Sequence, residues 1–262
     1  MYNEEDIKKV QGCLLEIFKV VRDVLDKMGI KYYAGFGTAL GAVRHNGFIP
    51  WDDDMDILVF RDDYERFLKE GQQYLPKNYF IQDVETEPNY NVVFAKVRKT
   101  DTVFLEYNSQ KLDINHGVYI DIFPIDYAPI DEKEIKKIDK KLKILRVRLS
   151  KGLVLAEPTY KHILRKTVTL GNMHDKKYYV RKFKKIVTDV KKGDMTVIYG
   201  NITACHCPKE WYGEGVMHKF EDTTIRLMTE YDKNLTQVYG DYMTPPPKEK
   251  QAPLHAPLEI KI

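Results

Sequence analysis

The chain of 262 residues is 43% hydrophobic and 31% charged, which is typical of a folded globular protein and excludes a disordered one. Its three cysteines argue against a disulfide framework and favour a reducing compartment. The sequence has no run of 18 apolar residues and no apolar signal-peptide core, so we expect a cytoplasmic protein without a membrane-spanning helix.

The first part of the chain predicts helices that alternate with short strands. Apolar side chains from Val10 to Met28 recur at helical spacing, and Gly29 suits the end of that helix. Asp62 suits the N-cap of a later helix. We expect, in order, a helix over 4–28, a strand over 31–36, a short helix over 38–45, a buried strand over 55–60 and a helix over 63–74.

The chain continues with strands and then becomes mainly helical. Pro124 predicts the end of a strand that begins at Val118, because proline lacks a backbone N–H. Gly240 predicts the end of a late helix, and the prolines from Pro245 onward predict an extended tail. The expected elements are strands over 79–84, 91–98 and 118–123, a lysine-rich helical region over 131–190 with breaks near Gly152 and Pro158, and a helix over 231–239.

This order of elements predicts the α+β class: a mixed sheet with flanking helices and a mainly helical C-terminal portion. The length fits one domain, or one domain with a substantial insertion. We assign residues 1–130 to the core of the domain. Residues 131–262 contain the basic helical region and a C-terminal segment that completes the same domain.

The net charge of +3 conceals an uneven distribution. Residues 131–193 contain 20 Lys and Arg but 7 Asp and Glu, a net charge of +13, and the rest of the chain carries −10. A basic segment on an acidic body indicates an anionic partner such as lipid, a glycan carrier or nucleic acid. Alternatively, long lysine side chains cover an apolar helical core there.

The acidic cluster from Asp52 to Asp56 is the main functional signal. It contains four carboxylates in five positions, and no Lys or Arg lies closer in the sequence than Arg44 and Arg61. Their mutual repulsion costs stability unless a cation binds there. Asp54 and Asp56 are two apart and project from the same face of a strand. Such a pair suits Mg²⁺ shared with a phosphate, and a solvated turn or a Ca²⁺ site is the alternative.

A glycine-rich turn precedes this cluster. It contains Gly35, Gly37 and Gly41, and glycines after a strand let backbone N–H groups approach a phosphate at the start of the next helix. Thr38 can donate its hydroxyl or cap that helix. A glycine turn followed by Asp-x-Asp on the next strand is the signature of a nucleotidyltransferase-like core.

That signature includes a third carboxylate on a later strand, and Asp121 is our choice. It is the polar residue within a run of Tyr, Ile and Phe, and an unpaired buried charge is costly unless it binds metal or acts as a base. Asp113 and Asp126 are the alternatives, although Asp126 better suits the cap of a turn after Pro124.

The motifs resemble the LicD family. The stretch from Gly37 to Asp56, which reads GTALGAVRHNGFIPWDDDMD, is similar to the hallmark of that family. Asp63 to Phe67, Tyr119 to Asp126, Tyr239 to Met243 and the prolines 245–247 resemble it as well. The resemblance implies a nucleotidyltransferase-like fold, Mg²⁺ (or Mn²⁺) and a CDP-alcohol donor. Bacterial members transfer phosphocholine from CDP-choline to sugars of teichoic acids or other surface glycans, and the family is similar to the fukutin-related proteins of animals.

The resemblance and the residues together define a candidate site. Asp54, Asp56 and Asp121 are the expected catalytic and metal-binding residues, with Asp121 in the metal shell or as the base for the acceptor hydroxyl. Four further residues are expected to bind substrate: Gly37, Thr38, Arg44 and His45. A cation at a helix C-terminus can also be structural.

The expected reaction is transfer of a phosphorylated alcohol from CDP to a hydroxyl of a glycan or its lipid-linked precursor, with release of CMP. Peripheral contact with an anionic membrane at the inner face is expected, and no nucleic-acid partner. Two alternatives remain. One is a nucleotidyltransferase that releases pyrophosphate, and the other is a non-catalytic glycan- or nucleotide-binding module.

Overall fold

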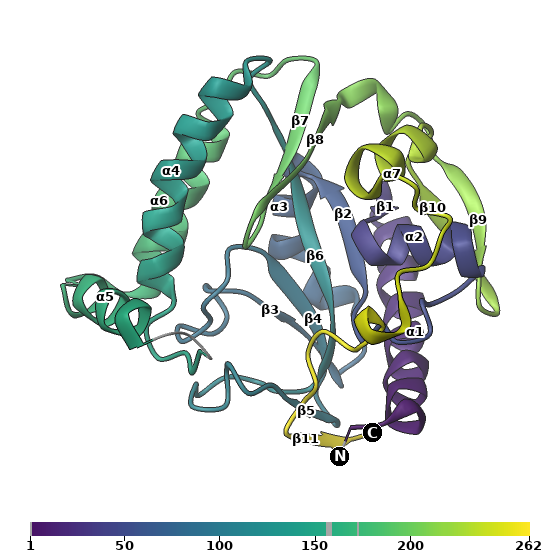
Figure 1. The fold of residues 1–262 in the computed structure, drawn as a ribbon, viewed down its shortest axis with the longest axis horizontal. Helices are drawn as coiled ribbons and strands as arrows, with labels where there is room; N and C mark the ends of the chain where they lie inside the picture. Colours follow the sequence, from purple (N-terminus) through teal and green to yellow (C-terminus); the bar gives the residue numbers. More distant parts are fainter. Residues whose placement is uncertain (1, 156–158, 172) are drawn as a thin grey trace.

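A mixed sheet of seven strands forms the centre of the molecule (Figure 1). The computed structural model describes residues 2–155, 159–171 and 173–262. Five strands follow the order β1-β2-β6-β4-β3, and β7 and β8 extend the sheet from the far end of β6. Their bounds are β1 Tyr32–Ala34, β2 Asp56–Phe60, β3 Tyr79–Gln82, β4 Ala95–Lys99, β6 Val118–Tyr127, β7 Met195–Tyr199 and β8 Thr203–Pro208.

The long strand β6 joins the two parts of the sheet. It pairs in parallel with β2, while its first half pairs with β4 and its last three residues pair with β7. The prediction that Pro124 ends this strand is wrong. Pairing with β4 stops at Ile122 and pairing with β7 begins at Ile125. Pro124 therefore lies between the segments of β6 that pair with β4 and with β7. Its missing N–H removes no hydrogen bond between strands there.

Three helices pack around the first strands. They are α1 Glu4–Lys27, α2 Phe36–His45 and α3 Arg61–Glu70, the last continued by the 3₁₀ turn η1 Gly71–Tyr74. The apolar stripe of α1 is buried against β6 and β4, and a capping box between Asn3 and Asp6 begins the helix. The prediction that Asp62 is the N-cap of α3 is wrong. The helix begins at Arg61, and Asp62 lies in its first turn. An acidic residue there still complements the helix dipole.

The lysine-rich region forms three helices, α4 Glu132–Leu149, α5 Thr159–Leu170 and α6 Lys176–Thr188. Helices α4 and α6 lie side by side at the left of the molecule in Figure 1, away from α1 at the right. Their apolar sides pack onto β7 through Leu142, Leu145, Phe183, Val187 and Val197. The predicted break near Gly152 is confirmed, and Pro158 lies outside the described residues. A second break, between α5 and α6, was not predicted.

The C-terminal segment returns across the sheet to the N-terminal side. It contains the hairpin β9 Val216–Phe220 and β10 Thr223–Leu227, the helix α7 Tyr231–Tyr239, and β11 Glu259–Lys261, with 3₁₀ turns η2 Lys209–Trp211 and η3 Lys248–Lys250. Gly240 ends α7 with φ 69°, as predicted. The tail pairs β11 with β5 Val103–Leu105, so both termini lie at the same end of the molecule (Figure 1).

The observed architecture confirms the predicted α+β class with a mixed sheet and flanking helices. Within the described ranges, none of the helices is both long enough and apolar enough to span a bilayer. The sheet draws strands from both sides of residue 131, since β7 and β8 pair onto β6.

Candidate active site

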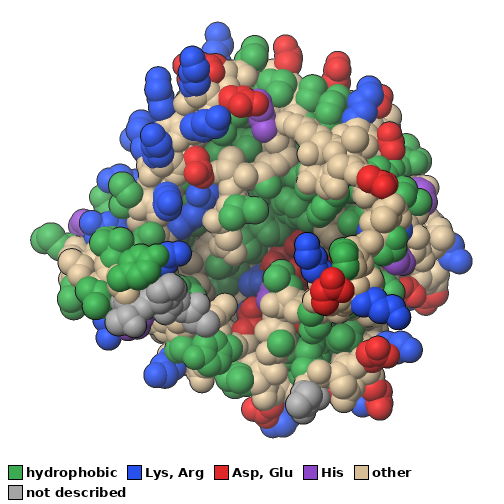
Figure 2. Space-filling view, in the orientation of Figure 1, with side chains coloured by type: hydrophobic (Ala, Val, Ile, Leu, Met, Phe, Trp, Pro, Cys, Tyr) green, Lys and Arg blue, Asp and Glu red, His purple; other side chains and the backbone are tan. Residues whose placement is uncertain are grey.

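Four aspartates line one cavity of about 360 Å³ at the end of β2. They are Asp52, Asp54, Asp56 and Asp121. Asp56 begins β2, and Asp121 is its direct partner in the parallel pairing of β2 with β6. Neighbouring strands lie about 4.8 Å apart, so the fold places these two residues next to each other. The structure thus brings the three predicted carboxylates together and adds Asp52. Figure 2 shows a hollow near the centre of this face, with acidic, basic and histidine side chains inside it.

Burial and mutual repulsion favour the protonated forms of these carboxyl groups. Burial and the charge of Asp54 raise the pKa of Asp52 to about 8. Burial also raises the pKa of Asp54, with a further contribution from Asp121, although His255 opposes this shift. The pKa of Asp56 lies well above its usual value for the same two reasons, burial first and then the neighbouring Asp54 and Asp121. A cation in this cavity would relieve the repulsion.

The glycine-rich stretch holds the acidic cluster in place, although it is not the separate turn that was predicted: Gly35 is the N-cap of α2, and Gly37 and Gly41 lie within the helix. Gly35 donates its N–H to the carbonyl of Asp56 at 3.0 Å, and the buried Thr38 hydroxyl accepts the N–H of Asp56 at 2.8 Å. A Cβ on Gly37 would lie 2.7 Å from an oxygen of Asp52, so only glycine lets that carboxylate approach the backbone. Thr38 therefore positions Asp56, whereas Gly37 lines the cavity itself.

Helix α2 points its N-terminus at the cavity. Phe36 and Gly37, its first two residues, line the cavity, and no side chain caps this end of the helix. Its free N–H groups and positive dipole end suit a phosphate. Phe36 has a positive φ of 41°, a strained conformation for a bulky residue that is common at functional sites.

Lys96 is a site residue that the sequence reasoning missed. It is buried on β4, and its Nζ lies 2.7 Å from Oδ1 of Asp121 and 3.3 Å from the centre of the Tyr119 ring. Asp121 therefore is not an unpaired charge within its strand. The available signal was the alternation of Lys96 and Arg98 with apolar residues in the strand predicted over 91–98, which places both cations on one face of that strand.

The acidic groups do not form a preformed metal cage. Across the described residues, no three Asp, Glu, His or Cys side chains are arranged to hold a metal ion by themselves. Asp121 is turned toward Lys96, whose Nζ donates to its Oδ1. Mg²⁺ commonly takes one or two carboxylates and completes its shell with water and substrate phosphates. The donor set therefore fits a metal shared with a phosphorylated ligand.

The runners-up for the third carboxylate lie elsewhere. Asp126 is buried and forms a bidentate ion pair with Arg61, with both N–O distances at 2.8 Å. Asp113 is exposed. Neither lines the acidic cavity, so Asp121 alone of the three candidates shares it with Asp54 and Asp56.

Comparison with known proteins is consistent with this geometry. Residues 29–146 match the model of the LicD/FKTN/FKRP nucleotidyltransferase domain, which includes β1, β2, β6 and all four aspartates. Residues 29–146 form a LicD-family domain. The predicted resemblance to LicD is confirmed.

Individual relatives extend the match. The chain is 29% identical to the lipopolysaccharide cholinephosphotransferase LicD of Haemophilus influenzae over 258 residues, which cover 95% of this chain and 96% of the relative. It is 45% identical to an uncharacterised protein of Rickettsia typhi over 114 residues, 44% of this chain and 34% of that one. It is 40% identical to the human ribitol 5-phosphate transferase FKRP over 51 residues, 20% of this chain and 10% of that protein.

Residues outside the LicD-family domain complete the cavity, and two of them, Leu254 and His255, belong to the C-terminal tail. Asp53 is buried and does not itself line the cavity, but it accepts hydrogen bonds from the backbone N–H of Leu254 at 3.2 Å and of His255 at 3.3 Å. Nδ1 of His255 lies 3.1 Å from Oδ1 of Asp53. Leu254 and His255 then form part of the cavity wall. The structure thus places His255, a residue of the proline-rich tail, at the site.

His255 also lies beside a second cavity, of about 390 Å³. Burial by itself would lower its pKa, but the Asp53 hydrogen bond and the charges of Glu106 and Asp54 raise it overall. The second cavity shares Asp121 and His255 with the acidic one. Its other lining includes Tyr90, Lys96 and residues of the α4–α5 connection. The LicD-family site thus has two adjoining spaces that meet at Asp121.

Arg44 and His45 lie away from the LicD-family aspartates. Nη1 of Arg44 donates to the carbonyl of Tyr242 at 2.9 Å, and its Nε donates to Nε2 of His45 at 2.9 Å. The His45 ring meets Trp51 edge-on, with ring centres 6.3 Å apart. Neither residue lines the acidic cavity. Arg44 thus connects the end of α2 to the segment that follows α7, and His45 accepts a hydrogen bond from Arg44 and packs on Trp51.

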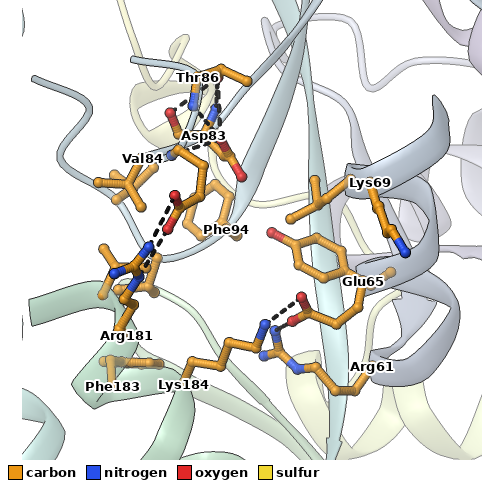
Figure 3. A pocket seen from close by; sticks show the side chains of 16 residues that line it. Arg61, Glu65, Lys69, Asp83, Val84, Thr86, Phe94, Arg181, Phe183 and Lys184 are labelled. Carbon is orange, nitrogen blue, oxygen red and sulfur yellow. Dashed lines mark hydrogen bonds and ion pairs between the residues drawn. The ribbon is translucent and has the colours of Figure 1, made fainter. Parts of the chain in front are cut away.

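A further cavity of about 330 Å³ lies between α3 and α6 (Figure 3). It shares only Phe94 with the acidic cavity. Several of its charged side chains pair with one another: Glu65 pairs with Arg61 and Lys184, and Arg181 pairs with Glu85. The pairs of Lys184 with Glu65 and of Arg181 with Glu85 join the helical region to the LicD-family domain.

Proposed function

We propose that this protein transfers a phosphorylated alcohol, with phosphocholine as the expected group, from a CDP-alcohol to a hydroxyl of a cell-surface glycan or its precursor, and releases CMP. The observation that carries the proposal is the placement of four aspartates in one cavity of a LicD-family domain. The names of the H. influenzae and human relatives, a cholinephosphotransferase and a ribitol 5-phosphate transferase, support phosphoalcohol transfer as the class of reaction.

We propose that Asp54 and Asp56 hold Mg²⁺ (or Mn²⁺), with Asp121 completing the shell or acting as the base. Bound there, the metal would neutralise the pyrophosphate of the donor and the charge on the departing CMP. The uncapped N-terminus of α2, with Gly37 beside Asp52, would bind the phosphates through backbone N–H groups. Lys96 supplies a further positive charge next to Asp121.

In the transfer step the acceptor oxygen attacks the phosphorus that bears the alcohol. The bond from that phosphorus to the CMP oxygen breaks, and the acceptor proton passes to Asp121. The second cavity adjoins the acidic one at Asp121, so a glycan hydroxyl that enters through it reaches the side chain that would take its proton. The basic surface of α4 and α6 would attract an anionic, lipid-linked acceptor. The predicted cytoplasmic position at the inner membrane face agrees with such a role.

Product analysis tests the proposal. The protein is incubated with Mg²⁺ and a candidate glycan, and CDP-choline, CDP-ribitol, CDP-glycerol and CTP are supplied separately. We expect CMP from a CDP-alcohol, which also names the donor. Pyrophosphate from CTP without turnover of any CDP-alcohol would replace the proposal with nucleotidyl transfer. Binding of nucleotide without any product would leave a non-catalytic module.

A further inference from the structure

Helix α5 buries polar side chains and exposes apolar ones. Its buried positions are polar, since Arg165 and Thr169 are 9% and 6% exposed, whereas Ile163 and Leu164 are 59% and 65% exposed. Arg165 is held inward, with Nη1 donating to the carbonyl of Ser150 at 3.2 Å. A helix on the surface of a globular protein normally buries its apolar side chains. Because Arg165 and Thr169 face inward, the apolar side of α5 faces solvent.

The outward face is continued by neighbouring apolar residues. We call the patch formed by these side chains the α5 face: Tyr160, Ile163, Leu164, Leu170 and Met173, all exposed. Figure 2 shows hydrophobic side chains gathered at the α5 end of this face of the molecule. Single exposed apolar residues are common on protein surfaces, but a contiguous group of this kind marks an interaction site.

Positive charge surrounds the α5 face. Residues 131–193 carry 20 basic and 7 acidic residues, and Lys161 and Lys166 of α5 itself are exposed. Figure 2 shows a concentration of Lys and Arg side chains along the neighbouring helical edge. An apolar helical face bordered by lysines is the pattern of a helix that lies in the interface of an anionic membrane. A protein partner would need a matching apolar and acidic surface, whereas anionic lipid supplies both features at once.

The position of the α5 face relates it to the site. Leu149, Leu153 and Leu155, which lead from α4 toward α5, line the second cavity. That cavity meets the acidic one at Asp121. A bilayer that contacts α5 would therefore lie beside the cavity through which the acceptor is proposed to enter.

We propose that the α5 face inserts into the interface of an anionic lipid bilayer and anchors the enzyme beside its lipid-linked acceptor. The link to the acceptor rests on the proposed function, but membrane binding by itself does not. Hydrophobic insertion and electrostatic attraction are the two signals that stable peripheral binding requires. The α5 face supplies the first, and the lysines of α4 to α6 supply the second.

Vesicle co-sedimentation tests this inference without any assay of transfer. Vesicles of phosphatidylglycerol and phosphatidylcholine are compared with vesicles of phosphatidylcholine alone. The wild-type protein should bind the anionic vesicles preferentially. The double variant Ile163→Gln/Leu164→Gln should bind them at least about tenfold more weakly, because it loses burial of two aliphatic side chains. The matched control Met217→Gln changes a 47% exposed apolar residue on β9, at the opposite end of the molecule (Figure 1), and should bind as the wild type does.

Three outcomes would overturn the inference. They are absence of binding to anionic vesicles, equal binding by the double variant and the wild type, and self-association of the wild type without lipid that the double variant loses. The last result would assign the α5 face to a second copy of the chain. Turnover with a soluble glycan is measured in parallel. If the wild-type protein binds anionic vesicles as expected but shows no transfer, the proposed function fails and the membrane inference stands.

Discussion

The contact between His255 and Asp53 should control how firmly the C-terminal tail closes over the site. His255→Ala removes the interaction between Nδ1 and Oδ1 at 3.1 Å and the edge contacts with Phe104 and Tyr119, whose ring centres lie 6.3 and 6.2 Å away. The two backbone hydrogen bonds to Asp53 remain. A hydrogen bond to a charged group contributes about 1.5–3 kcal/mol.

We therefore expect the free energy of local opening of the tail to fall by about 2 kcal/mol, or about thirtyfold in the opening equilibrium. Amide hydrogen exchange measured by mass spectrometry on peptides from residues 250–262 reports this opening. Exchange of α1 and β6 should not change, because the contact belongs to the tail. His218→Ala, which loses only an edge contact with Tyr231 at 6.0 Å, is the matched control.

The same contact predicts a pH dependence. Burial opposes the charged imidazole, but Asp53 and the neighbouring carboxylates raise the pKa of His255 overall. The folded tail thus binds a proton more tightly than the unfolded tail does. The added stability is complete below the unfolded pKa of about 6.5 and is lost as the pH rises through the raised value. Tail protection should decrease from about pH 6 to pH 9 in the wild type but not in His255→Ala. Equal protection of both proteins at both pH values would refute the reasoning.

Three further predictions concern the acidic cavity. Asp54→Asn or Asp56→Asn should abolish turnover and raise the melting temperature of the metal-free protein, because either change removes a repelled, buried carboxylate; activity that survives exhaustive chelation would refute the metal assignment. Mg²⁺ should raise the wild-type melting temperature more at pH 8 than at pH 6, since the raised carboxyl pKa values leave fewer groups ionised at the lower pH; a pH-independent shift would contradict this. Lys96→Met should destabilise the fold by about 3 kcal/mol or more by leaving Asp121 buried and unpaired, and Lys96→Met/Asp121→Asn should recover much of that loss in chemical denaturation, whereas additive effects would show that the pair is not coupled.

The sequence by itself determined the elements with strong local signals. The period of α1, the acidic cluster and the start of the buried strand at Val118 depend on short-range patterns, and each is found where the pattern predicted it. The glycine-rich stretch does not form a turn before the helix, because α2 begins at Phe36 and includes Gly37 and Gly41. The LicD resemblance followed from contiguous motifs for the same reason. In the sequence, nothing distinguishes Arg44 and His45 from the motif residues that line the cavity. In the structure, Arg44 contacts Tyr242 and His45 contacts Trp51, and neither lines the cavity.

Only the tertiary structure decided how distant residues share the site. Asp56 and Asp121 are neighbours because β2 pairs in parallel with β6, and the register of that pairing depends on the packing of the whole sheet. The partnership of Lys96 with Asp121 and of Asp53 with His255 joins residues 25 and 202 positions apart. No local pattern encodes such contacts, because burial of one charge selects a partner from anywhere in the folded chain. The outward apolar face of α5 was likewise invisible in the sequence, since helical spacing defines the two sides of a helix but not which of them faces the core.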